Sequence, residues 1–259
     1  MPQKKSKVRI DTRKWTEGRV VELYCWGDSL YSLRIEADVG PFEAGQFGQV
    51  GLVIEGEFVA RPYSFINAPD ERPLDFYFIT IPAGPLSTHL QDLRPADRIW
   101  VAKKAAGYLT LSNVPDGEHL WLLSTGTAVG PFLSILKTEE PWRRFKKMIL
   151  VHAVRTVAEL AYQEVVERFR EGYPEQFVMI PFVSRESCPF ALGGRIPQAI
   201  TDGRLEERAG IELKGRENQI MICGNPGMVQ DTTKVLVETR GFRENRRKEP
   251  GEISTERYW

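Results

Sequence analysis

The pattern of apolar and polar residues changes character near residue 115. Before that point, short alternating or β-rich runs recur with glycine, proline and aspartate between them, at residues 19–26, 30–37, 46–54, 58–66, 74–81 and 97–102. Closely spaced short strands of this kind predict an antiparallel barrel or sandwich. One short helix is expected to interrupt them over residues 87–93, with Ser87 as its N-cap.

Beyond residue 115 the pattern becomes strand then helix, repeated. Wholly apolar runs, typical of strands buried on both faces of a parallel sheet, occur at residues 120–123, 148–151, 177–182 and 220–223. Residues 156–170 keep the spacing of a helix. A capping box from Thr156 to Glu159 begins this segment, and Gly172 stands where a C-terminal glycine belongs.

A last helix is expected over residues 227–240, ended by Gly241. The two patterns together predict a two-domain chain. An antiparallel β-barrel over residues 15–115 is followed by an α/β domain with a parallel sheet over residues 116–259.

Charge and hydropathy narrow the possible partners and the compartment. The 35 basic and 35 acidic residues cancel, so the chain has no global attraction to nucleic acid or to an anionic membrane. No apolar run approaches the ~20 residues of a membrane span, and residues 1–10 lack the apolar segment of a signal peptide. We therefore expect neither nucleic acid nor a membrane as a partner, with the cytoplasm as the default location; a monomer is expected as well, although charge and hydropathy do not bear on it.

The cysteines and histidines are few and scattered: Cys25, Cys188, Cys223, His89, His119 and His152. Three distant cysteines argue against a disulfide framework and for a reducing compartment. They also cannot supply the four thiolates of a plant-type iron–sulfur centre, and the histidines lack the spacing of zinc ligands. We expect no metal, so any redox chemistry here needs an organic cofactor.

Arg61-Pro62-Tyr63-Ser64 closes one of the β-rich runs. Arginine can bind pyrophosphate oxygens, tyrosine offers a flat face to an isoalloxazine ring, and serine can donate a hydrogen bond to the flavin N5. The four residues therefore suit a flavin dinucleotide. A half-exposed strand ending in a turn accounts for them equally well.

Two glycine-containing turns follow buried strands in the second half. In residues 124–131 (STGTAVGP), glycines let the backbone approach a phosphate and Pro131 suits the first turn of a helix. A purely structural turn explains this segment as well. Residues 223–227 (CGNPG) lie at the carboxyl end of a strand, where open parallel sheets bind ligands. We favour a binding loop there over a core cysteine with a turn.

Nine short motifs, each weak by itself, occur in an order that resembles the ferredoxin–NADP⁺ reductase family, most closely its bacterial ferredoxin/flavodoxin–NADP⁺ reductases. They are RPYS (61–64), GPLS (84–87), AAG (105–107), STGTAVGP (124–131), VHAVR (151–155), VSR (183–185), GRIP (194–197), CGNPGM (223–228) and YW (258–259). The resemblance covers residues 18–259. It implies an FAD-binding barrel, then an NADP(H)-binding α/β domain whose C-terminal aromatic tail returns to the flavin.

The resemblance implies FAD contacts in the first domain, in the first glycine turn and at the chain end. The residues are Arg61, Pro62, Tyr63, Ser64, Tyr77, Pro85, Leu86, Ser87, Thr127, Tyr258 and Trp259. Leu86 and Ser87 would hold the FAD phosphates with backbone amides, while Tyr258 would cover the isoalloxazine and Trp259 the adenine. A frayed terminus is the alternative, but two large aromatic side chains need something flat to bury against.

The NADP(H) contacts that the resemblance implies follow the strands of the second domain. They are Val154, Arg155, Ser184, Arg185, Arg195, Asn225, Pro226, Gly227 and Asp231. Ser184, Arg185 and Arg195 match the group that grips the adenosine 2′-phosphate, which NAD lacks; solvated surface arginines are the alternative. Gly227 departs from the bulkier residue that the family would place after the proline.

The nicotinamide corner of the family joins a serine, a cysteine and an acid, which here are Ser64, Cys223 and Glu256. Hydride transfer from nicotinamide C4 to flavin N5 needs alignment more than acid–base help, so these catalytic candidates are expected to position and polarise. A solvated carboxylate is the alternative for Glu256.

The implied activity is hydride transfer between NADP(H) and FAD, and single-electron transfer between FAD and ferredoxin or flavodoxin. Such carriers are small and acidic, and the basic runs at 103–104, 143–147 and 246–248 could receive one unless they are merely solvated. Two alternatives stay open. One is an NADPH-dependent flavin reductase serving an oxygenase, free flavin or a quinone. The other is an FAD- and NADP-binding accessory protein without turnover, against which the nicotinamide corner argues.

Overall fold

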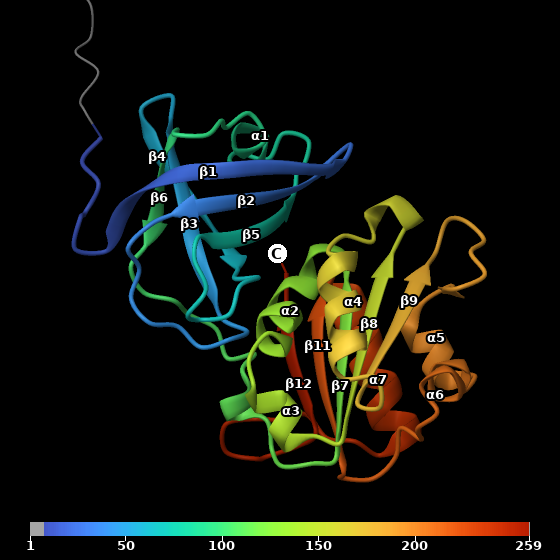
Figure 1. The fold of residues 1–259 in the computed structure, drawn as a ribbon. Coiled ribbons are helices and arrows are strands. Elements are labelled where there is room, and N and C mark those ends of the chain that lie inside the picture. The colour runs from blue at the N-terminus through green and yellow to red at the C-terminus, as the bar shows by residue number, and fades with distance from the viewer. Residues whose placement is uncertain (1–7, 259) are drawn as a thin grey trace, which may run out of the picture. The chain divides into compact units, whose positions relative to one another are not determined.

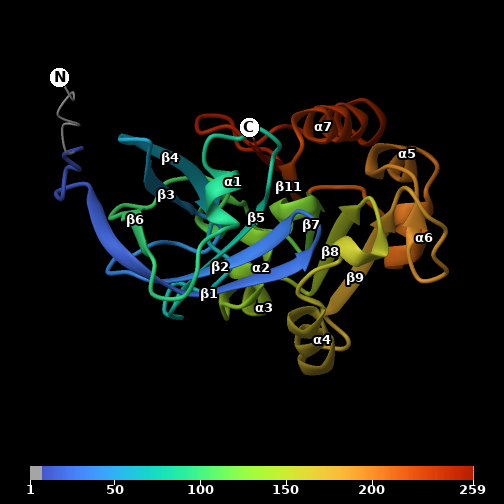
Figure 2. The same cartoon turned by 90° about the horizontal axis from the view of Figure 1, so that it is seen from above.

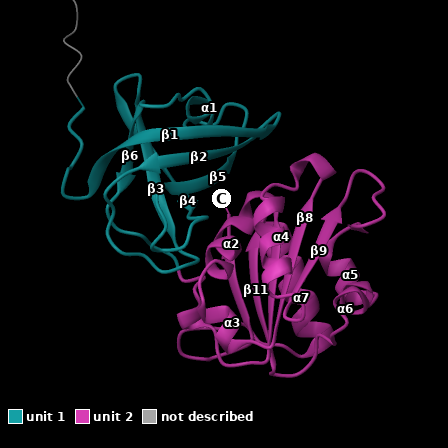
Figure 3. Cartoon of the chain, in the orientation of Figure 1, with its two compact units in different colours: residues 1–107 teal, residues 108–259 magenta. Residues whose placement is uncertain are grey.

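The computed structural model describes residues 8–258 of the chain. The chain divides into two compact units, Met1–Gly107 (unit 1) and Tyr108–Trp259 (unit 2), which are coloured separately in Figure 3. The expected contact of Trp259 falls outside the described residues. Within the described residues, no helix is long and apolar enough to cross a membrane.

Unit 1 is built on one six-stranded antiparallel sheet with the order β4-β3-β6-β1-β2-β5 (Figure 1). Its strands are β1 (Trp15–Gly27), β2 (Leu30–Glu36), β3 (Phe47–Ile54), β4 (Glu57–Ser64), β5 (Leu74–Ile79) and β6 (Arg98–Ala102). The two edge strands approach at an isolated antiparallel bridge between Phe65 and Phe76. The sheet therefore curls into a half-barrel around an apolar core, which confirms the predicted antiparallel architecture.

The short helix of unit 1, α1 (Ser87–Leu90), begins differently from the prediction. The cap position belongs to Leu86, and no side chain caps the helix. Ser87 is the first helical residue, and its Oγ accepts a hydrogen bond from the Ile81 N–H at 3.1 Å. The expected serine cap is wrong because this hydroxyl holds the preceding turn rather than the amides of its own helix.

Unit 2 contains a six-stranded parallel sheet with the order β10-β9-β8-β7-β11-β12. Its strands are β7 (His119–Thr125), β8 (Lys147–Val154), β9 (Phe177–Val183), β10 (Leu192–Gly193), β11 (Asn218–Gly224) and β12 (Ile253–Arg257). The four predicted strands are confirmed. The pattern missed β10 because it has only two residues, and β12 because its sequence, ISTER, carries no apolar run.

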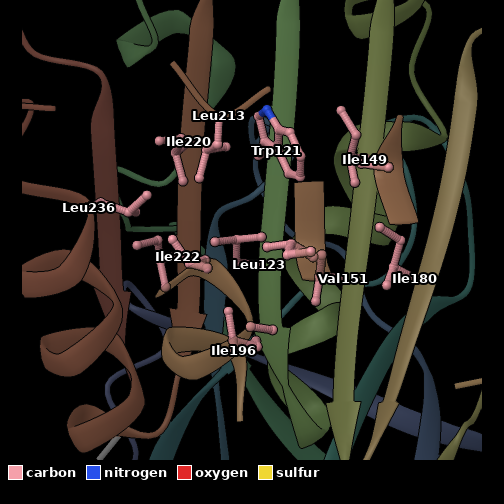
Figure 4. Packing of buried hydrophobic residues seen from close by; sticks show 14 of the residues in the cluster. Trp121, Leu123, Ile149, Val151, Ile180, Ile196, Leu213, Ile220, Ile222 and Leu236 are labelled. Carbon is pink, nitrogen blue, oxygen red and sulfur yellow. The ribbon is translucent and has the colours of Figure 1, made fainter. Parts of the chain in front are cut away.

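Helices cover both faces of this sheet. They are α2 (Gly130–Leu136), α3 (Glu140–Arg144), α4 (Gln163–Gly172), α5 (Ile196–Thr201), α6 (Arg204–Ala209) and α7 (Pro226–Arg240). Figure 2 shows α5, α6 and α7 on one face and α2, α3 and α4 on the other. On the α7 face, alternate strand residues such as Trp121 and Leu123 pack with Ile196 and Leu236 from the helices (Figure 4).

The predicted helix over 156–170 is wrong in its first half. Residues Val157–Glu159 form a single 3₁₀ turn, Tyr162 has a left-handed backbone with φ 59°, and α4 begins only at Gln163. The capping box does not form: Thr156 makes no side-chain cap bond, and the Glu159 carboxylate accepts the N–H of Arg155 at 3.0 Å.

A glycine stands at the end of each of the two long predicted helices. Gly172 is the last residue of α4 rather than the residue beyond it. The prediction for α7 is confirmed, including the left-handed Gly241 (φ 73°) that ends it. Asn225 caps the start of α7, its Oδ1 accepting hydrogen bonds from the N–H groups of Gly227 and Met228.

Candidate functional site

The predicted residues of unit 2 gather where its parallel strands end. Because all neighbouring strands of the sheet are parallel, the residues that follow them lie at one edge, the usual ligand edge of an open α/β sheet. Thr127 follows β7, Arg155 follows β8, Ser184 and Arg185 follow β9, and Asn225 follows β11. We call this edge the carboxyl edge.

Direct bonds join the segments after β8 and β9. The Val154 carbonyl accepts hydrogen bonds from both the N–H and the Oγ of Ser184, each at 3.1 Å. The Arg155 carbonyl accepts the N–H of Arg185 at 2.8 Å. The two backbones therefore run side by side past the ends of their strands, and they carry Arg155 and Arg185 together.

The short strand β10 brings Arg195 to the same place. Leu192 and Gly193 pair in parallel with Phe182 and Val183 of β9, so Arg195 stands two residues beyond β10 just as Arg185 stands two beyond β9. Both arginines are exposed, and among the described residues neither forms an ion pair with a carboxylate. Two uncompensated guanidinium groups at one edge are suited to a phosphate dianion.

A third loop, between β11 and α7, is tied to the end of β7. The Asn225 N–H donates to Thr125 Oγ1 at 3.1 Å. Gly224 has φ 143°, and a Cβ built on it would lie 2.1 Å from Thr125 Oγ1, so only glycine fits. Thr125 is a site residue that sequence reasoning missed, because its bond crosses 100 positions of sequence between two strands.

The remaining residues of the predicted NADP(H) set lie on or next to α7. The Asn225 side chain is occupied as the helix cap, and Pro226 is the first helical residue. Gly227 and Asp231 are exposed in the first two turns of the helix. Asp231 is therefore placed beside the carboxyl edge rather than on it.

Cys223 and Glu256 are neighbours, because β12 pairs in parallel with β11 and sets the two residues opposite each other. Tyr258 continues this strand, and its N–H donates to the Gly224 carbonyl at 2.9 Å. Burial, and then the nearby Glu256, raise the pKa of the Cys223 thiol well above its usual value, against a hydrogen bond from Tyr258. Burial raises the pKa of Glu256 to about 7. The thiol is therefore neutral, and the carboxyl group is partly protonated near pH 7.

Glu256→Gln should change how the stability of the protein depends on pH. In the unfolded chain the Glu256 carboxyl loses its proton around its ordinary pKa of 4.5, whereas in the folded chain it keeps the proton up to a pKa of about 7. The wild-type melting temperature should therefore fall relative to that of Glu256→Gln as the pH rises from 4.5 to 7, and the difference should stay constant above that window. Thermal melts of both proteins at pH 5, 6, 7 and 8 measure this. Parallel curves would show that Glu256 has an ordinary pKa.

The predicted residues of unit 1 lie at the end of β4 and at α1. Arg61 is exposed, and its Nη1 donates to the adjacent Ala60 carbonyl, at 2.7 Å. Tyr63 packs edge-on against Phe78, and burial raises the pKa of its hydroxyl to about 12, so the hydroxyl stays protonated. Ser64, the third member of the predicted nicotinamide corner, is buried at the end of β4.

The other predicted FAD residues of unit 1 fall into two places. Tyr77 is buried in β5, whereas Pro85 and Leu86 lead into α1 and Ser87 is its first residue. The first amides of a helix have no carbonyl partner within that helix, so the backbone at Leu86 and Ser87 can serve an anion. Among the described residues, unit 1 thus offers a guanidinium without a carboxylate partner, a phenol and the amides at a helix start, groups that suit a flavin dinucleotide.

An antiparallel half-barrel followed by a parallel sheet with two exposed arginines at its carboxyl edge is the architecture of a two-domain, dinucleotide-dependent oxidoreductase. In agreement, residues 122–234 match the family model described as the oxidoreductase NAD-binding domain. Among the described residues, no group of histidine, cysteine and acidic side chains is arranged to hold a metal ion.

Similarity over nearly the whole chain identifies the family. The chain is 44% identical over 245 residues to the flavodoxin/ferredoxin–NADP reductase of Shigella flexneri, covering 95% of this chain and 99% of that protein. It is 36% identical to the ferredoxin–NADP reductase of Pseudomonas aeruginosa, with 92% and 95% covered. A crystal structure of a ferredoxin NADP⁺ reductase from Neisseria gonorrhoeae with bound FAD and NADP superposes with a TM-score of 0.90 at 31% identity, covering 95% of this chain and 99% of that one. The chain belongs to the flavodoxin/ferredoxin–NADP reductase family.

Proposed function

We propose that this protein is an FAD-dependent reductase that exchanges electrons between NADP(H) and ferredoxin or flavodoxin. The single observation that carries the proposal is the paired placement of Arg185 and Arg195 at the carboxyl edge, two exposed arginines that have no carboxylate partner in the part of the chain that the structure describes. This arrangement suits a 2′-phosphate, and the relatives named above are NADP reductases.

Arg61, Tyr63 and Ser64, with the amides at the start of α1, are the residues that would hold FAD. When bound, this cofactor would supply the means to accept a hydride pair and to release electrons singly. A side chain that accepts or donates a proton is not needed for that exchange, so the residues act by holding the reactants in line. The Arg61 charge would meet pyrophosphate, and the protonated Tyr63 hydroxyl can donate a hydrogen bond.

Arg155, Ser184, Arg185 and Arg195 would hold the adenosine end of NADP(H). Asn225 would fix the β11–α7 loop beside the nicotinamide end, together with Thr127. Cys223 and Glu256, opposite each other on β11 and β12, would orient the nicotinamide with a neutral thiol and a carboxyl group near its pKa. All three cysteines, Cys25, Cys188 and Cys223, are free thiols, which suits the cytoplasmic setting that we propose for a monomeric enzyme.

The basic runs at 143–147 and 103–104 differ in how many of their charges are already paired with acidic side chains, and this decides which of them can attract an acidic carrier protein. Within the run at 143–147, Arg143 pairs with Glu139, Arg144 with Glu140, and Lys146 with Glu118. This run is largely neutralised by its own acidic neighbours, so it presents little net charge to a carrier.

The run at 103–104 is different. The Lys103 N–H donates to the Lys14 carbonyl at 2.9 Å, so Lys14, Lys103 and Lys104 gather in unit 1. In the described part of the chain, none of the three amino groups forms an ion pair. We call these residues the lysine trio, and we propose it as the surface that receives an acidic carrier protein.

Turnover with different electron acceptors tests both the function and the lysine trio. With NADPH as donor, kcat/KM should be higher for ferredoxin and flavodoxin than for free flavin or a quinone. Lys103→Glu with Lys104→Glu should raise the KM for the carrier on the order of tenfold at low salt, because charge steering is lost. Turnover with a small dye acceptor should be unchanged, and Arg143→Glu is the matched control from the neutralised run.

Preference for free flavin or a quinone would identify a flavin reductase instead. Failure to reduce any acceptor would identify a binding protein without turnover. An equal effect of the Lys103/Lys104 and Arg143 variants on carrier turnover would remove the lysine trio from the docking surface.

A further inference from the structure

His152 is a buried histidine that none of the roles above uses. It lies in β8, where it pairs with Ser124 of β7 and Pro181 of β9, and its exposed fraction is 1%. Its neighbour Val151 packs into the cluster on the α7 face, so His152, the next residue of the strand, points to the opposite face, where α2 and α4 lie (Figure 2).

One hydrogen bond connects His152 to the carboxyl edge. Its Nε2 lies 3.0 Å from the carbonyl oxygen of Gly126. A carbonyl can only accept, so Nε2 carries the proton and donates. Burial lowers the pKa of His152 to about 4, so the donor is a neutral imidazole under ordinary conditions.

Gly126 is the first residue of the 3₁₀ turn Gly126–Val129, which leads into α2. Its backbone is left-handed, with φ 55°, and a Cβ built there would meet nothing within 4 Å. A glycine has no side chain to hold its peptide in place, so the bond from His152 adds a side-chain restraint on this carbonyl to the backbone bonding of the 3₁₀ turn. The next residue, Thr127, is the one expected beside the nicotinamide.

The same turn is tied on its other side. Thr125, directly before Gly126, accepts the Asn225 N–H through Oγ1. His152 from β8 and Asn225 from the β11–α7 loop therefore hold two successive residues of the turn. Together these bonds fix the turn relative to both neighbouring strands of β7.

We infer that His152 is a positioning residue, which orients the Gly126–Thr127 peptide for the nicotinamide end of NADP(H) by donating Nε2–H to the Gly126 carbonyl. This inference rests on the proposed function. It separates two parts of the nucleotide site: the arginines read the adenosine end, and His152 shapes the turn at the other end. Loss of the donor should therefore impair the whole dinucleotide and spare its adenosine fragment.

The test compares His152→Leu, which removes the donor at similar volume, with His152→Gln, whose amide nitrogen can still donate. In the FAD-loaded protein, His152→Leu should raise the KM for NADPH and the Kd for NADP⁺ by roughly fivefold to thirtyfold, because the partly buried Gly126 carbonyl loses its side-chain partner. His152→Gln should stay within about threefold of the wild type, as expected when the hydrogen bond is kept. The Kd for 2′,5′-ADP, which carries only the adenosine end, should be unchanged in both variants.

Equal impairment by leucine and glutamine, or a parallel loss of 2′,5′-ADP binding, would show that His152 only packs, and would overturn the inference while leaving the proposed function intact. If the unmodified protein fails to bind NADP⁺, both the proposed function and the inference fall. Melting temperatures of the two variants distinguish a local change from unfolding.

Discussion

Replacing Arg185 and Arg195 together by alanine should raise the KM for NADPH by roughly 10- to 150-fold while leaving the KM for NADH nearly unchanged. The reason is that NADH lacks the 2′-phosphate, and a charge-assisted bond to such a group contributes about 1.5–3 kcal/mol. The placement of Arg195 two residues beyond β10, alongside Arg185 beyond β9, makes a joint effect expected. Steady-state kinetics with both nucleotides measure it.

Arg170→Ala is the matched control for this experiment. Arg170 is also an exposed arginine of unit 2, but it lies on α4, pairs with Glu167 at 2.6 Å and should not contribute to NADPH binding. If the double variant loses NADPH and NADH to the same extent, Arg185 and Arg195 do not read the 2′-phosphate, and the evidence for an NADP-specific edge is gone.

Gly224→Ala should disrupt the carboxyl edge more than any other single methyl group added to it. The new Cβ would lie 2.1 Å from Thr125 Oγ1, in a backbone conformation with φ 143° that other residues rarely adopt. Strain of this kind costs about 1–3 kcal/mol, and the overlap adds to it. We expect a melting temperature lower by several degrees and NADPH turnover reduced by at least tenfold, on the order set by that strain.

Gly227→Ala offers a control three residues further along. A Cβ there would approach only Asn225 Oδ1, at 3.2 Å, and the backbone is helical. This variant should keep its stability and most of its activity. Equal behaviour of the two alanine variants would show that the close approach of Gly224 to Thr125 does not support the site.

The strands of both units could be predicted from sequence because their apolar patterns are strong. The wholly apolar runs of β7, β8, β9 and β11 are buried in the centre of the parallel sheet, as expected. In contrast, β12 is visible only through its pairing with β11, since the sequence ISTER has no periodic apolar face. The local pattern of apolar residues therefore predicts the central strands of the sheet. It misses a strand such as β12, which forms because it pairs with a neighbouring strand.

The other differences between the structure predicted from sequence and the observed structure come from the partners that individual side chains bind. Thr156 and Glu159 have the spacing of a capping box, yet the carboxylate accepts the Arg155 N–H, and the chain turns once more before α4 begins. The pairing of Cys223 with Glu256 follows from the register of β11 and β12. Neither the bond between Glu159 and Arg155 nor the pairing of Cys223 with Glu256 can be predicted from sequence spacing alone. The bonds of Thr125 and His152 likewise join residues far apart in the chain, so no local motif marks them.

The central claim, that electrons pass from NADPH through bound FAD to a carrier protein, is tested most directly by one anaerobic absorbance measurement. The purified protein, loaded with FAD, should show the visible absorbance band of the oxidised flavin, at about one FAD per chain. Addition of NADPH should bleach this band, and addition of oxidised flavodoxin or ferredoxin should restore it while the carrier becomes reduced. A chain that binds no FAD, or a band that NADPH does not bleach, would contradict the account, as would a bleached band that neither carrier restores.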